Sequence, residues 1–139
     1  LDSIGKGRLI TIDIEILENL PVHERITYLK GSSTDKKIVQ KISEMIQENQ
    51  VVLVILDSDH NMPHVLREME IYSKLVTKGS YMIVEDSNIN GHPIMPNWGN
   101  GPYEAIEKFL ENNDSFEIEK EPEKYFMTFN PNGYLRKIS

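Results

Sequence analysis

The chain has 139 residues, of which 39% are apolar and 27% are charged, values typical of a globular protein. This length fits one domain, and we predict a single domain over residues 1–139. No apolar run approaches the ~20 residues that a membrane-spanning helix needs. Cysteine is absent, which excludes disulfides, thiolate metal sites and a cysteine nucleophile. The net charge of −7, with no basic stripe, argues against nucleic-acid binding.

Strand and helix patterns alternate along the first part of the chain. Residues 8–14 and residues 26–29 are rich in isoleucine and other strand formers, and we predict a strand at each. Residues 35–49 carry apolar side chains at three- and four-residue steps, which predicts an amphipathic helix. Residues 51–56 are apolar without alternation, which is typical of a strand buried on both faces.

The second part continues the alternation and ends in strands. Pro63 opens a predicted helix that ends at Gly79, and Pro102 opens another after a long loop. The remaining predicted elements are strands at residues 81–84, 116–118, 125–129 and 134–138, with a turn at residues 131–133. This order predicts an α/β fold, Rossmann-like and doubly wound, with a mostly parallel sheet. The C-terminal strand pair is predicted to be antiparallel, because too few residues separate the two strands for a crossover helix.

Acidic residues follow three of the predicted strands. Asp13 ends the first strand, Asp57 and Asp59 follow the apolar run, and Glu85 and Asp86 follow the next strand. The carboxyl ends of parallel strands share one edge of the sheet, where open α/β sheets bind ligands. Crowded carboxylates repel one another unless a cation lies among them, and Mg²⁺ prefers oxygen ligands. We therefore predict a Mg²⁺ site here, although each acid taken alone is also typical of a solvated loop or a helix cap.

Other polar residues near these strand ends have two interpretations each. His60 could act as a general base, since histidine titrates near neutral pH, or it could be an ordinary surface histidine. Asp13 stands where nucleotide-binding sheets bind ribose hydroxyls. Ser32 and Ser33 follow the second strand and could line the same ligand or cap the next helix. A glycine-rich phosphate-binding motif and a P-loop are both absent.

Several motifs carry a resemblance to a known family. They include LDSDH at residues 56–60, VED at residues 84–86 and TFNPNGY at residues 128–134. With these motifs the sequence resembles the cephalosporin hydroxylase / rhamnosyl O-methyltransferase family through nearly all of its length. Despite the hydroxylase name, that family looks like class I S-adenosylmethionine-dependent methyltransferases with a bound magnesium ion. The arrangement is also similar to catechol O-methyltransferase.

The resemblance implies where the cofactor binds. Asp13 matches the acid that binds the ribose of S-adenosylmethionine, and Ser32 and Ser33 match the adenine side of the pocket. Asp57 is expected beside the same cofactor. Methyltransferases of this class begin with a strand and a glycine-rich turn that contact the methionine part of the cofactor. We expect that first βα unit just before Leu1, so the sequence is predicted to lack it and the domain to be N-terminally incomplete.

The resemblance also implies roles in metal binding and catalysis. Glu85 and Asp86 match the metal-binding pair, and the interval of 28 residues from Asp57 to Glu85 suits that arrangement. The third metal ligand is either Asp57, which the spacing favours, or Asp59. His60 falls near the general base of catechol-type enzymes, where a lysine stands, so the identity of the base stays open.

The predicted function is Mg²⁺-assisted, S-adenosylmethionine-dependent O-methylation of a small molecule or sugar, as in glycolipid, polysaccharide or antibiotic tailoring. One alternative is an iron-dependent hydroxylase, with His60, His64 and Asp57 as the metal ligands. A second is a non-catalytic metal- or nucleotide-binding fragment. We expect a cytoplasmic protein with a small-molecule or sugar acceptor, no nucleic acid and no membrane span; whether it forms a homo-oligomer stays open.

Overall fold

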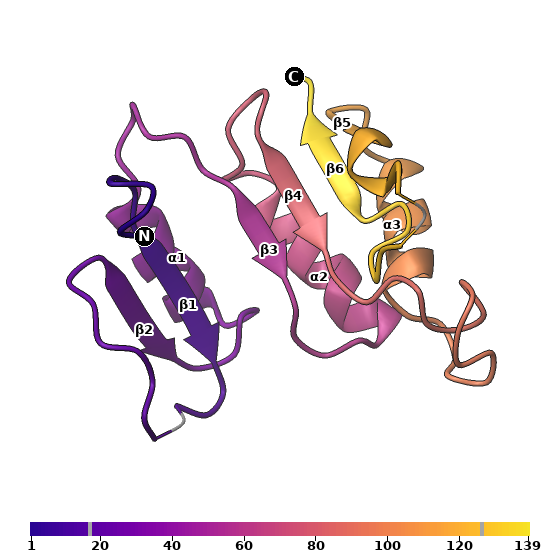
Figure 1. The fold of residues 1–139 in the computed structure, drawn as a ribbon, viewed down its shortest axis with the longest axis horizontal. Helices are drawn as coiled ribbons and strands as arrows, with labels where there is room; N and C mark the ends of the chain where they lie inside the picture. The colour runs from indigo at the N-terminus through magenta and orange to yellow at the C-terminus, as the bar shows by residue number, and fades with distance from the viewer. Residues whose placement is uncertain (17, 126) are drawn as a thin grey trace. The chain divides into compact units, whose positions relative to one another are not determined.

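A computed structural model describes residues 1–16, 18–125 and 127–139. The chain divides into two compact units, Leu1–Gln47 and Glu48–Ser139, and each unit is described by itself (Figure 1). The single domain over residues 1–139 stays a prediction. In the part of the chain that the structure describes, no helix has both the length and the apolar character needed to cross a membrane.

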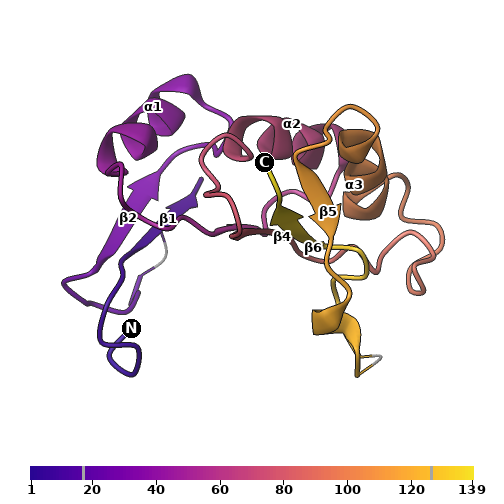
Figure 2. The same ribbon diagram turned by 90° about the horizontal axis from the view of Figure 1, so that it is seen from above.

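The first unit consists of two parallel strands and one helix. Strand β1 (Leu9–Asp13) pairs in parallel with β2 (Ile26–Lys30), with Asp13 opposite Lys30. Helix α1 (Lys36–Met45) lies over one face of this pair (Figure 2). Asp35 caps the helix, since its carboxylate accepts a hydrogen bond from the backbone N–H of Lys37 at 2.7 Å. Because the strands are parallel, the residues that follow each of them lie at one edge.

The second unit is a four-stranded sheet with two α-helices. Its elements are β3 (Val54–Leu56), α2 (Met62–Tyr72), β4 (Tyr81–Val84), α3 (Pro102–Leu110), β5 (Phe116–Ile118), the 3₁₀ helix η1 (Glu121–Glu123) and β6 (Tyr134–Lys137). The strand order is β3-β4-β6-β5. The β3–β4 pair is parallel, whereas β6 is antiparallel to both β4 and β5. The predicted α/β fold with parallel strands and an antiparallel C-terminal strand pair is confirmed, and the two strands of that pair are β5 and β6.

The core of the second unit lies between the sheet and its helices. Helices α2 and α3 pack on one another and lie on the same face of the sheet (Figures 1 and 2). Met69 of α2, Met82 of β4 and Leu135 of β6 are fully buried. Ala105, Ile106 and Phe109 of α3 are also buried, at the three- and four-residue steps expected of an amphipathic helix. Burying a side chain of this kind contributes about 1.5–3 kcal/mol, so this core holds the sheet edge in place.

The prediction that residues 51–56 are buried on both faces is wrong for the described chain. Val51, Leu53 and Ile55 are exposed, Ile55 by 54%. The strand ladder begins only at Val54, and the preceding residues are held by a different contact. The backbone N–H of Val52 donates to Thr77 Oγ1 at 2.9 Å. Since α2 and α3 both cover the same face of the sheet, the alternate side chains of β3 are exposed.

The predicted strand at residues 125–129 is also wrong for the residues that can be compared. Tyr125 and residues 127–129 are not in a strand, and Phe126 lies outside the described residues. The physical reason is the sheet order, because β6 already pairs with β4 on one side and with β5 on the other. The helices are shorter than predicted as well: α1 ends at Met45, and α2 ends at Tyr72.

Candidate functional site

The acidic residues of the second unit meet where β3 and β4 end. Leu56, the last residue of β3, pairs with Val84, the last residue of β4. The backbone N–H of Glu85 donates to the carbonyl oxygen of Leu56 at 2.9 Å. Asp57 and the Glu85–Asp86 pair therefore leave neighbouring strands at the same level, which is the ligand-binding edge of an open α/β sheet.

His60 lies close to two of these acids. Its Nε2 atom is 3.5 Å from Asp57 Oδ1 and 3.5 Å from Asp86 Oδ2. The same Nε2 atom is buried and has no hydrogen-bond partner among the described residues. One ligand atom from each of these three side chains lies within 4.8 Å of the others, close enough to surround one cation. We call Asp57, His60 and Asp86 the strand-end cluster.

Glu85 shares the charge of this cluster without being one of its three members. Burial raises the pKa of the Glu85 carboxyl group, and the negative charges of Asp57 and Asp86 raise it further, while His60 opposes them. A carboxylate surrounded by like charges is stabilised when a cation is bound nearby. The electrostatics around Glu85 thus favour a positive ion at this edge of the sheet.

The structure does not bring Asp59 or His64 into the cluster. Asp59 Oδ1 accepts hydrogen bonds from the backbone N–H of Asn61, at 3.2 Å, and from its side-chain amide. His64 lies on α2, where its Nε2 atom is 3.5 Å from Glu68 Oε1. Among the described residues, the cluster therefore contains one histidine, whereas the hydroxylase alternative needs two histidines on one metal.

Sequence reasoning missed Glu68, a buried acid that holds the loop after β3. Only 3% of its side chain is exposed, and its Oε2 atom accepts a hydrogen bond from Ser58 Oγ at 2.8 Å. Ser58 directly follows Asp57, so the bond ties the cluster loop to α2. The available signal was helical spacing, because Glu68 lies on the same helix face as the buried residues Val65 and Tyr72.

Glu104 braces the long loop at residues 87–101. Its carboxylate accepts hydrogen bonds from the backbone N–H of Gly101 at 2.7 Å and from Asn90 Nδ2 at 2.8 Å, and His92 Nε2 lies 3.0 Å away. Burial raises the pKa of Glu104, but these hydrogen bonds outweigh it and lower the pKa to about 2. The His92 ring also stacks on Tyr103, with ring centroids 3.6 Å apart.

The end of this loop lies against the segment that carries His60. The Trp98 Nε1–H group donates to the carbonyl oxygen of His60 at 3.4 Å. The backbone N–H of Met62 donates to the carbonyl oxygen of Asn100 at 3.1 Å. Trp98 remains exposed, so its ring is available beside the strand-end cluster.

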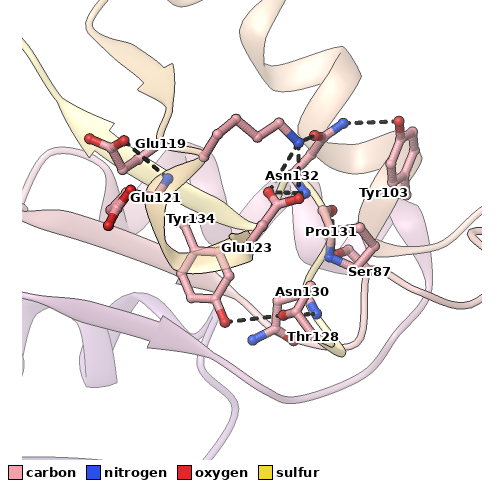
Figure 3. Close-up of polar contacts among 11 residues, drawn as sticks. Ser87, Tyr103, Glu119, Glu121, Glu123, Thr128, Asn130, Pro131, Asn132 and Tyr134 are labelled. Atoms are coloured by element: carbon pink, nitrogen blue, oxygen red, sulfur yellow. Dashed lines mark hydrogen bonds and ion pairs between the residues drawn. The ribbon is translucent and has the colours of Figure 1, made fainter. Parts of the chain in front are cut away.

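A cleft of about 410 Å³ opens beside Glu85 and Asp86, within the size range of ligand sites. The other residues that line it are Met127, Thr128, Phe129, Asn130 and Tyr134. Met127 is 91% exposed and Phe129 is 70% exposed, so the rim is apolar. Thr128 Oγ1 and the Tyr134 hydroxyl lie 3.2 Å apart, within hydrogen-bond distance (Figure 3). The cleft therefore combines polar groups with apolar side chains.

In the first unit, three of the predicted cofactor residues, Asp13, Ser32 and Ser33, lie at or after the ends of β1 and β2. The carbonyl oxygen of Asp13 accepts a hydrogen bond from Gly31 N–H at 2.8 Å. The exposed Asp13 carboxylate accepts from Glu15 N–H at 2.8 Å. Ser32 Oγ lies 3.0 Å from Thr34 Oγ1 and so braces the turn before α1, in which Ser33 also lies. Asp13, Ser32 and Ser33 thus lie at or after the carboxyl ends of two parallel strands, and their role in cofactor binding stays a prediction.

The described α/β fold has counterparts among solved structures. It is similar to the solved structure "MycE Methyltransferase from the Mycinamycin Biosynthetic Pathway in Complex with Mg and SAH", with a TM-score of 0.54 and 17% sequence identity. The match covers 76% of this chain and 28% of that chain. A second crystal form of MycE matches with the same TM-score and 19% identity, over 76% of this chain and 27% of that one.

Residues 1–138 match the family Rhamnosyl O-methyltransferase/CmcI, and the chain belongs to this family, so the resemblance found in the sequence is confirmed. The chain is 44% identical over 114 residues to a rhamnosyl O-methyltransferase of Mycobacterium bovis, and this match covers 79% of this chain and 46% of that protein. The enzyme of the same name in Mycobacterium leprae is 39% identical over 133 residues, covering 92% and 58%. The chain thus spans about half the length of the curated relatives it matches.

Proposed function

We propose that this protein transfers a methyl group from S-adenosylmethionine to a sugar hydroxyl, assisted by Mg²⁺ at the end of β3 and β4. The observation that carries the proposal is the strand-end cluster, in which His60 Nε2 lies 3.5 Å from a carboxylate oxygen of both Asp57 and Asp86. The curated relatives are rhamnosyl O-methyltransferases, and MycE was solved with Mg and SAH, which supports the reaction type and both cofactors.

The two aspartates of the cluster, together with the adjacent Glu85, fit a hard divalent cation. Asp57, Glu85 and Asp86 would supply carboxylate oxygens, the ligand type that Mg²⁺ prefers. Burial raises the pKa of Glu85 most, and the charges of Asp57 and Asp86 raise it further; a bound cation would relieve that repulsion. A bound Mg²⁺ would polarise the acceptor hydroxyl and hold its oxygen in place. The hydrogen bonds of Asp59 to Asn61 argue against Asp59 as the third ligand.

His60 is proposed as the general base. Its Nε2 atom would take the proton of the acceptor hydroxyl, and the carboxylates of Asp57 and Asp86 would stabilise the resulting imidazolium. S-adenosylmethionine would supply the methyl group, which passes from the sulfonium sulfur to the acceptor oxygen and leaves S-adenosylhomocysteine. The chain would contribute mainly by holding the acceptor oxygen and the base in line.

Asp13, Ser32 and Ser33 are proposed to bind the nucleoside of the cofactor. The Asp13 carboxylate is exposed at the end of β1, where an acid can accept hydrogen bonds from ribose hydroxyls. The serine hydroxyls follow β2 at the same edge, and the bond between Gly31 and Asp13 keeps the two segments together. A role for Asp57 beside the cofactor stays a prediction.

The acceptor is proposed to enter the cleft beside Glu85 and Asp86. The polar groups that line the cleft, such as the Tyr134 hydroxyl, suit the hydroxyls of a sugar. The apolar side chains of Met127 and Phe129 at its rim suit the hydrophobic part of a glycoside. The names of the curated relatives support a rhamnosyl acceptor. A role in lipid or polysaccharide biosynthesis, a cytoplasmic location and the oligomeric state stay predictions.

The proposal is tested by following methyl transfer from S-adenosylmethionine to methyl α-L-rhamnopyranoside by mass spectrometry. We expect a methylated product with Mg²⁺, little product with EDTA, and recovery when Mg²⁺ is restored. Calorimetry with S-adenosylhomocysteine measures cofactor binding separately. Unchanged methyl transfer in EDTA would contradict the metal role, and a hydroxylated product that forms only with iron and 2-oxoglutarate would instead support the hydroxylase alternative.

A further inference from the structure

Asp86 has an unusual backbone conformation for a residue that must present a ligand atom. Its φ angle is 52°, in the left-handed region that residues with a Cβ atom adopt rarely. Such a conformation persists only where surrounding contacts hold it. It turns the chain away from β4 and leaves Asp86 Oδ2 3.5 Å from His60 Nε2. The contacts that support this conformation therefore also decide where the carboxylate lies.

The support comes from the segment just before β6. Asn130 Oδ1 accepts a hydrogen bond from the backbone N–H of Asp86 at 2.9 Å, across 44 residues of sequence. Asn130 is buried, and its own backbone N–H donates to Thr128 Oγ1 at 3.0 Å, which holds its backbone in place (Figure 3). The bond therefore holds the peptide unit between Glu85 and Asp86, from which the Asp86 side chain departs.

Further hydrogen bonds hold the segment around Asn130 against the end of β4. Ser87 Oγ donates to the carbonyl oxygen of Pro131 at 2.7 Å (Figure 3), and the backbone N–H of Val84 donates to the carbonyl oxygen of Gly133 at 2.8 Å. Gly133 approaches β4 so closely that a Cβ atom there would clash with the Val84 carbonyl oxygen. Only glycine fits this approach. We call residues 130–133 the Asn130 turn.

The outer side of the Asn130 turn makes contacts that do not involve Asp86. Asn132 Nδ2 donates to the Tyr103 hydroxyl at 2.9 Å, and the backbone N–H of Asn132 donates to Glu123 Oε1 at 3.0 Å (Figure 3). The turn thus carries two asparagines, one bonded to the proposed metal ligand and the other bonded away from it. Asn132 has a φ of 61°, so glycine can replace it without backbone strain.

We propose that Asn130 is a positioning residue that sets the affinity of the strand-end cluster for a divalent cation by fixing the backbone of Asp86. The proposal rests on the metal site of the proposed function and goes beyond it, because Asn130 is offered as a contact of the ligand and not of the ion. Residues that orient metal ligands typically change metal affinity by about 10- to 100-fold when replaced.

The experiment titrates the protein with Mn²⁺ alone and follows the loss of the free-ion signal by electron paramagnetic resonance. Asn130→Ala is expected to weaken binding about tenfold, whereas the matched control Asn132→Gly binds like the wild type. Asn130→Asp keeps the acceptor oxygen and adds a negative charge, so it is expected to bind at least as tightly. If the alanine variant does not fold, the aspartate variant carries the test, and binding about tenfold weaker than the wild type would contradict the proposal.

A double-mutant cycle separates positioning from a merely structural role. In the Asp86→Asn background, Asn130→Ala should cause no further loss of Mn²⁺ affinity, although it still lowers the melting temperature. Equal Mn²⁺ binding by the wild type and Asn130→Ala would overturn this proposal alone. A wild-type protein that binds no Mn²⁺ would overturn it together with the metal site. A failure of methyl transfer with Mn²⁺ binding intact would count only against the proposed reaction.

Discussion

His60 Nε2 and Asp86 Oδ2 lie 3.5 Å apart although their residues follow two different strands, β3 and β4. The parallel pairing of Leu56 with Val84 brings the two segments to the same level. Asp57 Oδ1 lies at the same distance, 3.5 Å, from the same Nε2 atom. A histidine placed in this way can act as a base toward a group held by the acids, or it can bind the ion itself.

Replacing His60 separates these two roles. His60→Gln removes the proton acceptor, so we expect kcat for methyl transfer to fall by about 100-fold or more. Mg²⁺ affinity should change little, because carboxylates are the proposed ligands. Calorimetry with Mg²⁺ and steady-state kinetics measure the two quantities. A variant that loses Mg²⁺ binding and activity together would assign His60 to the metal instead.

The two aspartates of the loop after β3 form a matched pair. We expect Asp57→Asn to weaken Mg²⁺ binding by at least about tenfold, since it removes one negative ligand from a small set. Asp59→Asn should leave Mg²⁺ binding nearly unchanged, because the Asp59 carboxylate is bonded to Asn61. Both variants are titrated with Mg²⁺ under the same conditions. The reverse order of effects would make Asp59 the third ligand.

Glu68 is expected to matter for stability through its buried hydrogen bond. Glu68→Ala leaves Ser58 Oγ without this partner and should lower the free energy of unfolding by about 1–3 kcal/mol. Glu68→Gln keeps an acceptor oxygen and should lose less. Urea denaturation of the wild type and both variants measures the difference. An alanine variant as stable as the glutamine variant would show that the bond to Ser58 contributes nothing.

The lowered pKa of Glu104 predicts how the free energy of unfolding changes with pH. Its folded-state pKa is about 2, below the usual 4.5, so its contribution is fully present above pH 4.5 and is lost as the pH falls toward 2. Solvent screening limits the contribution to about 1–2 kcal/mol. Urea denaturation of the wild type and Glu104→Gln at several pH values follows the difference in free energy of unfolding. We expect that difference to shrink with acid, and a constant difference would contradict the assignment.

Contacts that follow from the order of the strands could be predicted from the sequence. Residues that leave adjacent parallel strands must meet, so the order of strands along the chain is enough to place Asp57 and Asp86 at one edge. Asn130 could not be linked to Asp86 in this way, because 44 residues separate them and the bond depends on how β6 inserts between β4 and β5. Residues that form direct neighbours in the sheet were accessible from sequence, whereas those that support them through loops were not.

The same limit explains the wrong strand predictions. The run at residues 125–129 has a strand-like composition, but β6 already has a partner on each edge. The apolar run at residues 51–56 was expected to be covered on both faces, whereas the two helices of its unit lie on one. The composition of a segment shows that it can form a strand, whereas the order of the strands in the sheet decides whether a neighbouring strand is available to pair with it.

The central claim is a divalent cation at the ends of β3 and β4, and anomalous diffraction from crystals grown with Mn²⁺ tests it most directly. We predict one strong peak about 2.0–2.3 Å from carboxylate oxygens of Asp57, Glu85 and Asp86. The peak should vanish in crystals of Asp86→Asn, while Asp59→Asn leaves it in place. No peak at saturating Mn²⁺, or a peak at other residues only, would contradict the account.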